Sequence, residues 1–195
     1  MRVGVLALQG DVREHICALQ KCGVETVEVR RPEDMDNIYG LVIPGGESTT
    51  IGKLMVHNKL DVEILRKHEH GMPIYGTCAG AILLAKHIVG SRQHSLGLMD
   101  ISVKRNSYGR QSESFETNLV IDGFLHPLHA IFIRAPLITE VHNGAQILAE
   151  FKDSPVLIRQ GNLLASTFHP ELTGDYRIHQ YFVDMIQKSR SHWYV

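Results

Sequence analysis

Short apolar runs alternate with amphipathic stretches through the first half of the chain. Four runs have the length and continuity of buried strands, at residues 3–8, 24–29, 41–43 and 74–77. Helical patterns follow at residues 11–23, where Asp11 and Glu14 suggest a helix cap, and at residues 49–70, which we expect to break near Asn58. Apolar strands separated by helices indicate a parallel sheet that is covered on both faces.

The pattern changes in the second half, where tight turns separate the later apolar runs. Strand-like runs occur at residues 101–104, 118–121, 130–133, 146–151, 156–159 and 163–167. The Gln-Gly-Asn sequence at residues 160–162 indicates a hairpin, and residues 175–188 form a helical pattern whose apolar face we assign to the core. We therefore predict a single α/β domain over residues 1–195. It has three layers: a mostly parallel central sheet, flanking helices, and an added antiparallel strand region.

Composition and charge narrow the class of protein. The 195 residues are 44% hydrophobic and 21% charged, which is ordinary for a globular domain and excludes a disordered tail, a collagen-like fibre or a disulfide miniprotein. Lys and Arg number 20 against 21 Asp and Glu, so the formal net charge is -1. Because no global basic field exists, we expect neither nucleic acid nor a membrane as a partner.

The cysteines and the N-terminal run bear on the cellular compartment. The apolar run that ends at Leu8 is too short for a signal peptide or a membrane span, and three cysteines cannot all pair internally. We therefore expect a reducing, cytoplasmic location. Cys17 and Cys22 lie five residues apart with no metal-binding pattern beside them, so we expect them to pack in the core.

The most informative segment is the Gly-Thr-Cys-Ala-Gly sequence of residues 76–80, which stands between an apolar strand and a helix. It is the cysteine counterpart of the Gly-x-Ser-x-Gly nucleophile elbow, a sharp turn that exposes the nucleophile. The helix N-terminus that follows favours the thiolate form of Cys78, and the amide of Ala79 would face a developing oxyanion. The alternative is a small buried cysteine at a close helix–strand contact, since free cysteines are commonly buried.

A histidine and a carboxylate follow another apolar strand, in the sequence His169-Pro170-Glu171. Proline disfavours the helical conformation of the residue before it, so we expect His169 to be extended and Glu171 to face the same way. An imidazole oriented by a carboxylate is what an activated thiol requires. Cys78, His169 and Glu171 therefore form a candidate catalytic triad. The alternative for His169 is a solvated histidine in a turn.

A glycine pair follows the third predicted strand, within the sequence Pro-Gly-Gly-Glu-Ser-Thr-Thr of residues 44–50. Its backbone amides could bind an anion, and Ser48 or Thr49 could cap the next helix. On its own such a loop is commonly only a turn. It gains weight because parallel-sheet proteins bind ligands at the carboxyl ends of their strands, where Cys78 is also expected.

These segments resemble a known family. The sequences at residues 76–80 and 169–171 look like the triad of class I glutamine amidotransferases, which have a flavodoxin-like fold. Other segments are similar, in order along the chain, to the glutaminase subunits of pyridoxal 5'-phosphate synthase: residues 7–11, 44–50, 105–111, 114–116, 132–136 and 173–175. The resemblance covers essentially the whole chain. Residues 105–111 and 132–136 are the segments specific to this subunit family.

The resemblance implies hydrolysis of L-glutamine to L-glutamate and ammonia. The ammonia would pass to a barrel-shaped synthase subunit that builds pyridoxal 5'-phosphate from a pentose phosphate and a triose phosphate, and this chain would need no metal and no cofactor. Cys78 would be the nucleophile, His169 the acid and base, and Glu171 the orienting carboxylate. The oxyanion would lie between the amides of Gly46 and Ala79. The resemblance assigns the glutamine site to six residues: Gly46, Glu47, Ser48, Arg105, Ile133 and Arg134.

The two arginines and a glutamine have alternative roles at this site. Arg105 and Arg134 could pair with the carboxylate of the substrate, hold the site loops, or form structural ion pairs. Gln9, near the end of the first predicted strand, could steady the peptide between Gly45 and Gly46.

Two other classes of function fit the same residues. One is a cysteine hydrolase or peptidase that works without a partner, and the other is a regulatory or scaffolding subunit without turnover. An acyl-enzyme formed only with glutamine analogues would exclude the first, and an inert Cys78 would favour the second. Because a glutaminase that worked alone would waste glutamine, we expect the free subunit to be poorly active. The expected cause is an oxyanion site at Gly45 and Gly46 that forms only when the partner docks.

Overall fold

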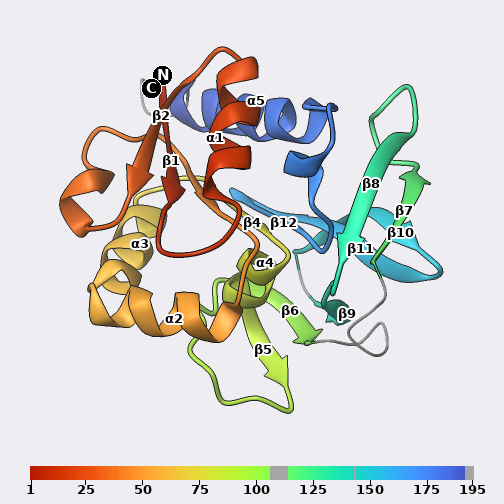
Figure 1. Ribbon diagram of the computed structural model, residues 1–195, viewed down its shortest axis with the longest axis horizontal. Coiled ribbons are helices and arrows are strands. Elements are labelled where there is room, and N and C mark those ends of the chain that lie inside the picture. The colour runs from red at the N-terminus through yellow and green to blue at the C-terminus, as the bar shows by residue number, and fades with distance from the viewer. Residues whose placement is uncertain (106–113, 143, 192–195) are drawn as a thin grey trace.

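The computed structural model describes residues 1–105, 114–142 and 144–191. Within these residues the central sheet has seven strands in the order β10-β11-β12-β4-β3-β1-β2 (Figure 1). Their bounds are β1 (Arg2–Leu6), β2 (Glu25–Val29), β3 (Leu41–Ile43), β4 (Ile74–Thr77), β10 (Gln146–Phe151), β11 (Ser154–Gln160) and β12 (Leu163–Ser166). The five strands from β12 to β2 run parallel, whereas β10, β11 and β12 pair antiparallel. The predicted α/β fold is therefore confirmed.

Two smaller sheets contain the other described strands. One has the order β5-β6-β9, and the other pairs β7 with β8. Their bounds are β5 (Ala85–Val89), β6 (Met99–Lys104), β7 (Ser114–Leu119), β8 (Leu128–Ile133) and β9 (Leu137–Val141). β5 and β9 were not among the predicted strands, and β7 begins earlier than its predicted bounds of residues 118–121. Exposed Lys86 and His87 interrupt β5, and exposed Thr139 and Glu140 interrupt β9, so neither strand forms an apolar run.

Helices cover both faces of the central sheet. Their bounds are α1 (Val12–Lys21), α2 (Ser48–His57), α3 (Leu60–Glu69), α4 (Ala79–Leu84) and α5 (Arg177–Ser191). Figure 1 shows α1 and α5 together on one side, where they share a buried cluster with β7 and β8. The other cluster joins α2, α3 and α4 to the β5-β6-β9 sheet. The predicted break near Asn58 is confirmed, because Lys59 takes a φ of 58° between α2 and α3.

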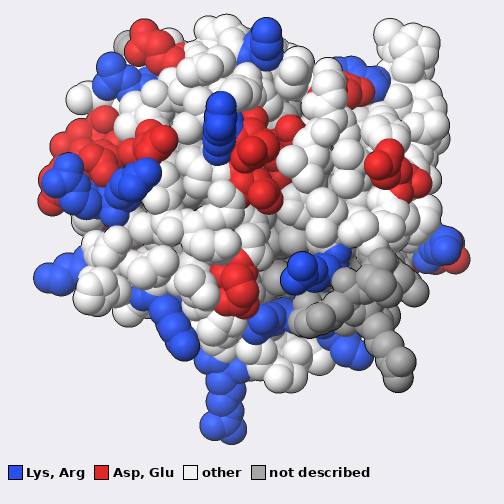
Figure 2. Space-filling model, viewed as in Figure 1, with Lys and Arg blue, Asp and Glu red and all other residues white. Residues whose placement is uncertain are grey.

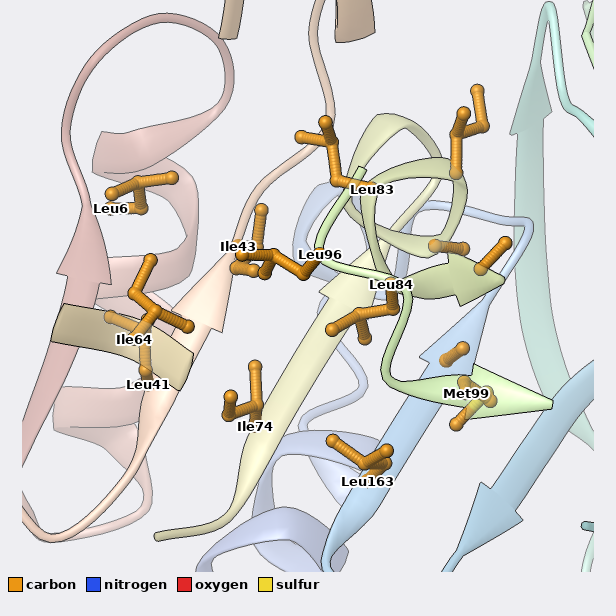
Figure 3. Close-up of a cluster of buried hydrophobic side chains, with 14 of the residues drawn as sticks. Leu6, Leu41, Ile43, Ile64, Ile74, Leu83, Leu84, Leu96, Met99 and Leu163 are labelled. Atoms are coloured by element: carbon orange, nitrogen blue, oxygen red, sulfur yellow. The ribbon is translucent and has the colours of Figure 1, made fainter. Parts of the chain in front are cut away.

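The buried clusters join segments that are far apart in the sequence. Figure 3 shows labelled members of the cluster on the side of α2, α3 and α4: Leu6, Leu41, Ile43, Ile64, Ile74, Leu83, Leu84, Leu96, Met99 and Leu163. The opposite cluster contains four buried residues from the predicted apolar face of α5: Ile178, Phe182, Met185 and Ile186. The assignment of this helix face to the core is therefore confirmed.

The cysteines of α1 differ from the sequence expectation. Cys17 is exposed and Cys22, at the end of the helix, is only partly buried. The buried face of α1 is made by His15, Ala18 and Leu19 instead. The expectation that both cysteines pack in the core is wrong for Cys17, because it lies outside the helix face that contacts the sheet.

Charged side chains of both signs are spread over the face of the molecule shown in Figure 2. This distribution agrees with a composition of 20 Lys and Arg against 21 Asp and Glu. Among the described residues, none of the helices has both the length and the apolar character required to cross a bilayer.

Candidate active site

The candidate residues meet at the carboxyl ends of the central parallel strands. β4 lies between β3 and β12, so the segments that follow these three strands are neighbours. Cys78 follows β4, the glycine pair follows β3, and His169 follows β12. This is the edge at which open α/β sheets bind ligands.

Cys78 occupies a strained turn between β4 and α4. Its φ is 47° and its ψ is -100°, a backbone conformation that is rare for a residue with a side chain. Its amide donates to the Ser166 carbonyl at 2.8 Å. A side chain at Gly80 would collide with the carbonyl oxygen of Ile43, and one at Gly76 would collide with the backbone of Gly80. Both glycines are therefore needed for the helix to approach the sheet behind the cysteine.

Cys78 is 7% exposed as a residue. Its thiol sulfur lies 3.9 Å from the Ile133 carbonyl oxygen, to which it can donate. His169 lies close to the same strand, because its amide donates to the Ile131 carbonyl at 2.8 Å. β8 therefore contributes backbone atoms to the positions of both candidate catalytic residues.

His169 and Glu171 form a buried pair. The Nδ1 atom of His169 lies 2.8 Å from Oε1 of Glu171, and both side chains are almost inaccessible to solvent. An extended segment was predicted to bring these two side chains together, but Glu171 lies in a short 3-10 helix, η2 (Pro170–Leu172). The predicted contact between the two side chains is present, but the predicted extended backbone through Glu171 is wrong. The turn after His169 brings the carboxylate back to the ring.

The environment of His169 favours the imidazolium form. Burial by itself lowers the pKa of His169, but hydrogen bonding with Asp11, Cys78 and Glu171 raises it to about 12. Because Nδ1 is bonded to Glu171, the other ring nitrogen, Nε2, is the one available for proton exchange. A cationic imidazole next to a thiol is the arrangement that stabilises a thiolate nucleophile.

Asp11 is a second carboxylate at the same imidazole. Its Oδ2 lies 3.4 Å from Nδ1 of His169. The sequence predicted Asp11 as a helix cap, and it does occupy the N-cap position of α1, but its side chain makes no capping hydrogen bond. Asp11, His169 and Glu171 offer atoms that could hold a metal ion, all within 4.8 Å of one another. Both carboxylates face one nitrogen, which is the geometry of an oriented imidazole rather than of a coordination shell.

A cavity of about 410 Å³ opens in front of the cysteine. This volume is within the range of small-molecule sites. The cavity is lined by thirteen residues: Gln9, Asp11, Gly46, Glu47, Ser48, Cys78, Ala79, Ile82, Arg105, Ile133, Arg134, His169 and Leu172. All the candidate site residues from the sequence line it except Glu171, which lies behind His169.

A second cavity, of about 430 Å³, lies at the opposite edge of the sheet, where β3 and β4 begin. Tyr39, Lys67, His70 and Arg190 are among its lining residues, and no cysteine is. The candidate active site and the second cavity are therefore similar in volume, and they differ in the chemistry of their lining residues.

Glu47 holds the loop between β3 and α2. Its carboxylate accepts the amides of Thr49 and Thr50 at 3.2 and 2.7 Å, so Glu47 caps α2. The expectation that Ser48 or Thr49 would be the cap is wrong. Burial would raise the pKa of Glu47, but the hydrogen bonds from Thr50 and Thr49 outweigh it and lower the pKa.

Arg105 joins this loop to the end of β6. Its Nη2 lies 3.1 Å from Oε1 of Glu47, and its Nη1 donates to Thr49 Oγ1 at 2.9 Å. Nη1 also donates to Oε1 of Gln93 at 2.6 Å, and the Ser48 hydroxyl donates to the same oxygen at 3.2 Å. Gln93 was not among the predicted site residues, because no local pattern in the sequence marks it. Of the segment at 105–111, residues 106–111 lie outside the described residues.

Gln9 contacts the loop one peptide later than expected. Its Oε1 accepts the amide of Glu47 at 2.7 Å, so it steadies the peptide between Gly46 and Glu47. The Gly45 carbonyl accepts the amide of Asp11 at 3.1 Å. A side chain at Gly45 would collide with the ring of His169, and Gly46 has a φ of 152°, which favours glycine. Both glycines are therefore required by local geometry.

Ile133 and Arg134 line the cavity from the end of β8. Arg134 is exposed and has a φ of 45°. This positive φ marks a strained turn at the rim, as at Cys78.

Known proteins are similar to this chain over most of its length. The profile of the SNO glutamine amidotransferase family matches residues 5–188. A protein named pyridoxal 5'-phosphate synthase subunit PdxT, from Moorella thermoacetica, is 55% identical over 187 residues, which cover 95% of this chain and 100% of that protein. The protein of the same name from Pseudothermotoga lettingae is 58% identical over 186 residues, which cover 95% of each chain.

Solved structures give the same result. A crystal structure described as a glutamine amidotransferase is 50% identical, with a TM-score of 0.91, and the match covers 95% of this chain and 98% of the other. A putative GMP synthase component from Thermoplasma acidophilum shares the fold at 17% identity, with a TM-score of 0.73 over 100% of this chain and 98% of the other. Because the family profile spans most of its length and its relatives match over nearly their whole chains, this chain belongs to the SNO glutamine amidotransferase family.

Proposed function

We propose that this chain hydrolyses L-glutamine to L-glutamate and ammonia, as the glutaminase subunit of a pyridoxal 5'-phosphate synthase. The observation that carries the proposal is the buried His169–Glu171 pair, with its 2.8 Å contact, at the cavity that Cys78 lines. Membership of the glutamine amidotransferase family and relatives named PdxT support the substrate and the pathway.

The proposed reaction proceeds through a covalent intermediate. The Cys78 thiolate attacks the side-chain amide carbon of glutamine, and the resulting tetrahedral intermediate loses its C–N bond. His169 gives its proton to the leaving nitrogen, which departs as ammonia and leaves a glutamyl thioester. His169 then takes a proton from water, which attacks the thioester and releases glutamate.

The environment of His169 suits both proton transfers. Cys78 is one of the groups that raise the pKa of His169. Once the thiolate has become a neutral thioester or tetrahedral adduct, that contribution ends and the imidazolium becomes a stronger acid. The proton is therefore released more readily at the point when the leaving nitrogen needs it. Glu171 keeps Nδ1 occupied throughout, so Nε2 performs both transfers.

Backbone and side-chain groups around the cavity bind the substrate in this proposal. The amides of Gly46 and Ala79 stabilise the oxyanion, and one such donor is commonly worth ~3 kcal/mol of barrier. Six residues bind glutamine: Gly46, Glu47, Ser48, Arg105, Ile133 and Arg134. Arg105 acts on the site by holding Glu47 and Thr49, as its hydrogen bonds indicate. Arg134, exposed at the rim, is the guanidinium we assign to the substrate carboxylate.

A synthase partner of barrel architecture receives the ammonia and uses it with a pentose phosphate and a triose phosphate. We propose that docking of this partner activates the glutaminase by setting the peptide between Gly45 and Gly46. In the structure the Gly45 carbonyl accepts a hydrogen bond from the amide of Asp11. The peptide between Gly45 and Gly46 is trans, so the amide of Gly46 points away from Asp11. A cytoplasmic location fits the reaction, because a reducing compartment keeps the Cys78 thiol free.

The test measures glutamate release from L-glutamine by this chain alone and mixed with a pyridoxal 5'-phosphate synthase subunit. We expect release to rise with the partner, to vanish in Cys78→Ala, and to persist in the matched control Cys17→Ser, whose side chain is exposed on α1. Equal turnover with and without the partner would overturn activation by docking. No release in either mixture would overturn the glutaminase and favour a scaffolding role.

A further inference from the structure

A buried hydrogen-bond network lies behind the candidate triad. His15 of α1 and His179 of α5 are both fully buried, and His15 Nδ1 lies 3.0 Å from His179 Nε2. The other nitrogen of His15, Nε2, lies 3.0 Å from Thr77 Oγ1 and 3.5 Å from Oε2 of Glu171. Thr77 precedes the nucleophile directly, so His15 contacts both Glu171 and the residue next to Cys78.

The two carboxylate oxygens of Glu171 differ in their hydrogen bonding. Oε1 accepts from His169, whereas Oε2 is buried and makes no hydrogen bond to the residues that the structure describes. A buried carboxylate oxygen without a donor is costly. His15 Nε2, at 3.5 Å, is the nitrogen that faces it.

The protonation of the two histidines follows from one unpartnered atom. Nδ1 of His179 is buried and makes no hydrogen bond within the described part of the chain. Orphaned buried N–H groups are rarer than orphaned acceptors, so His179 carries its proton on Nε2 and donates it to His15 Nδ1. His15 Nδ1 is then an acceptor, and its own proton lies on Nε2, which is hydrogen-bonded to Thr77 Oγ1 at 3.0 Å and has Oε2 of Glu171 beside it at 3.5 Å.

Burial keeps both histidines neutral in this arrangement. It lowers the pKa of His179 to about 4, and together with repulsion from His179 and His169 it lowers the pKa of His15 well below its ordinary value. The titratable groups near His15 are His179 from α5, Glu171 from η2, Tyr75 from β4 and His169, which follows β12.

We propose that His15 is a positioning residue of the triad, which donates its Nε2 proton toward Oε2 of Glu171 and so holds Oε1 against Nδ1 of His169. The chain of donors runs from His179 to His15, then to Glu171. Its effect is to fix the ring of His169 in the orientation that leaves Nε2 for the thiol. This role rests on the proposed glutaminase activity, since it concerns how that triad is held.

Two substitutions separate the hydrogen bond from the space that the ring fills. His15→Gln keeps an N–H donor near the position of Nε2, whereas His15→Leu fills a similar volume with no donor. With the synthase subunit present, we expect kcat for glutamine hydrolysis to fall roughly 10–100-fold in His15→Leu and only about threefold in His15→Gln. We expect KM to stay within about twofold in both, because His15 lies behind Glu171 and not in the cavity.

The matched control is Leu19→Ala, which removes a fully buried side chain from the same helix. We expect it to lower the melting temperature while leaving kcat unchanged. Wild-type kcat in His15→Leu, or equal losses in His15→Leu and His15→Gln, would overturn the proposal.

A measurement on the unmodified chain tests the donor role of His15 even if His15→Leu does not fold. Nitrogen-15 NMR of the imidazoles should show His15 neutral and protonated on Nε2 throughout pH 5–8. A proton on Nδ1, or titration within that range, would overturn the donor role. If wild-type protein released no glutamate, the glutaminase proposal would fail, and this tautomer measurement would still test whether His15 carries the proton that the proposed donor role requires.

Discussion

The two halves of the candidate active site are held in different ways. Behind the catalytic groups, Glu171 and His15 have fully buried side chains, and their contacts join α1, β4, η2 and α5. In front of them, Glu47 and Arg105 have side chains that are 49% and 30% exposed, and an ion pair of 3.1 Å joins their loops. Buried polar groups are costly unless each one is paired, whereas exposed ion pairs are weak and are screened by salt.

This difference separates the chemistry from the recognition of substrate. The rear half fixes the imidazole before any ligand arrives, because its groups have little freedom to move without losing hydrogen bonds. The front half is a set of loops whose contacts cost little to rearrange. Docking of a partner could therefore adjust the front half without disturbing the triad. Three substitutions test this division.

The largest effect is expected in the rear half, from Glu171→Gln. The amide fills the same volume but removes the negative charge that stabilises the imidazolium of His169. We expect kcat to fall roughly 10³-fold, about 4 kcal/mol of barrier, with little change in KM. Steady-state glutamate release with the synthase subunit present measures this. Glu69→Gln, at an exposed carboxylate, is the control, and activity within fivefold of wild type would contradict the role of Glu171.

The second-largest effect is expected in the pH dependence of the free energy of unfolding. The unfolded chain binds a proton at His179 near pH 6.5, but the folded protein does so only near a pKa of about 4. Between these values the unfolded state binds more protons, so the stabilisation present above pH 6.5 is lost as the pH falls toward 4. At about 1.4 kcal/mol per unit, His179 accounts for about 3 kcal/mol of this loss.

His179→Leu should remove that contribution, because leucine does not titrate. We expect the variant to be less stable at pH 8, where it leaves His15 without its donor. Its unfolding free energy should nevertheless fall less steeply between pH 6.5 and pH 4. Urea unfolding across this range measures the slope, and His87→Leu, at an exposed histidine, should leave it unchanged. A wild-type slope in His179→Leu would show that this residue is not buried as a neutral group.

The smallest effect is expected in the front half, from Arg105→Gln. Loss of the guanidinium releases Glu47 and Thr49, so we expect KM for glutamine to rise about tenfold with kcat nearly unchanged. Arg105→Lys should be intermediate, because one ammonium cannot reproduce the fork that reaches Glu47, Thr49 and Gln93.

Salt provides the matching control for the front half. The KM of the wild type should rise with ionic strength, because the pair between Arg105 and Glu47 is partly exposed. The KM of Arg105→Gln should rise less, because only the contact between Arg134 and the substrate carboxylate remains to be screened. A loss of kcat without a change in KM would place Arg105 with the rear half and contradict the division.

The parallel part of the fold was predictable because its strands are continuous apolar runs between helices. β3 and β4 have the predicted bounds, residues 41–43 and 74–77. β1 ends earlier than predicted, at Leu6, since the chain then turns toward Gly10. β5 and β9 were not predictable from apolar runs, because they lie at the surface and their pairing with β6 comes from tertiary contacts.

The site shows the same division between local and distant information. The elbow at Cys78 and the His-Pro-Glu sequence are local patterns, so the sequence predicts both. His15 is different, because it meets a residue 164 positions away, and nothing in its surroundings along the chain marks that contact. The pattern that could have found it is a lone histidine on the apolar face of an amphipathic helix, four residues after Asp11. Gln93 has no such pattern.

The bond between the amide of Cys78 and the carbonyl of Ser166 extends the β4–β12 pairing to the nucleophile itself. Two neighbouring strands in the interior of the sheet therefore anchor the turn that holds the nucleophile, and the second of these strands leads to the base. The amides of such core strands are among the best protected from exchange with water, because their exchange requires large-scale opening of the fold. Heat should accordingly remove activity and tertiary structure in one transition, and no partly melted form of the chain should retain turnover.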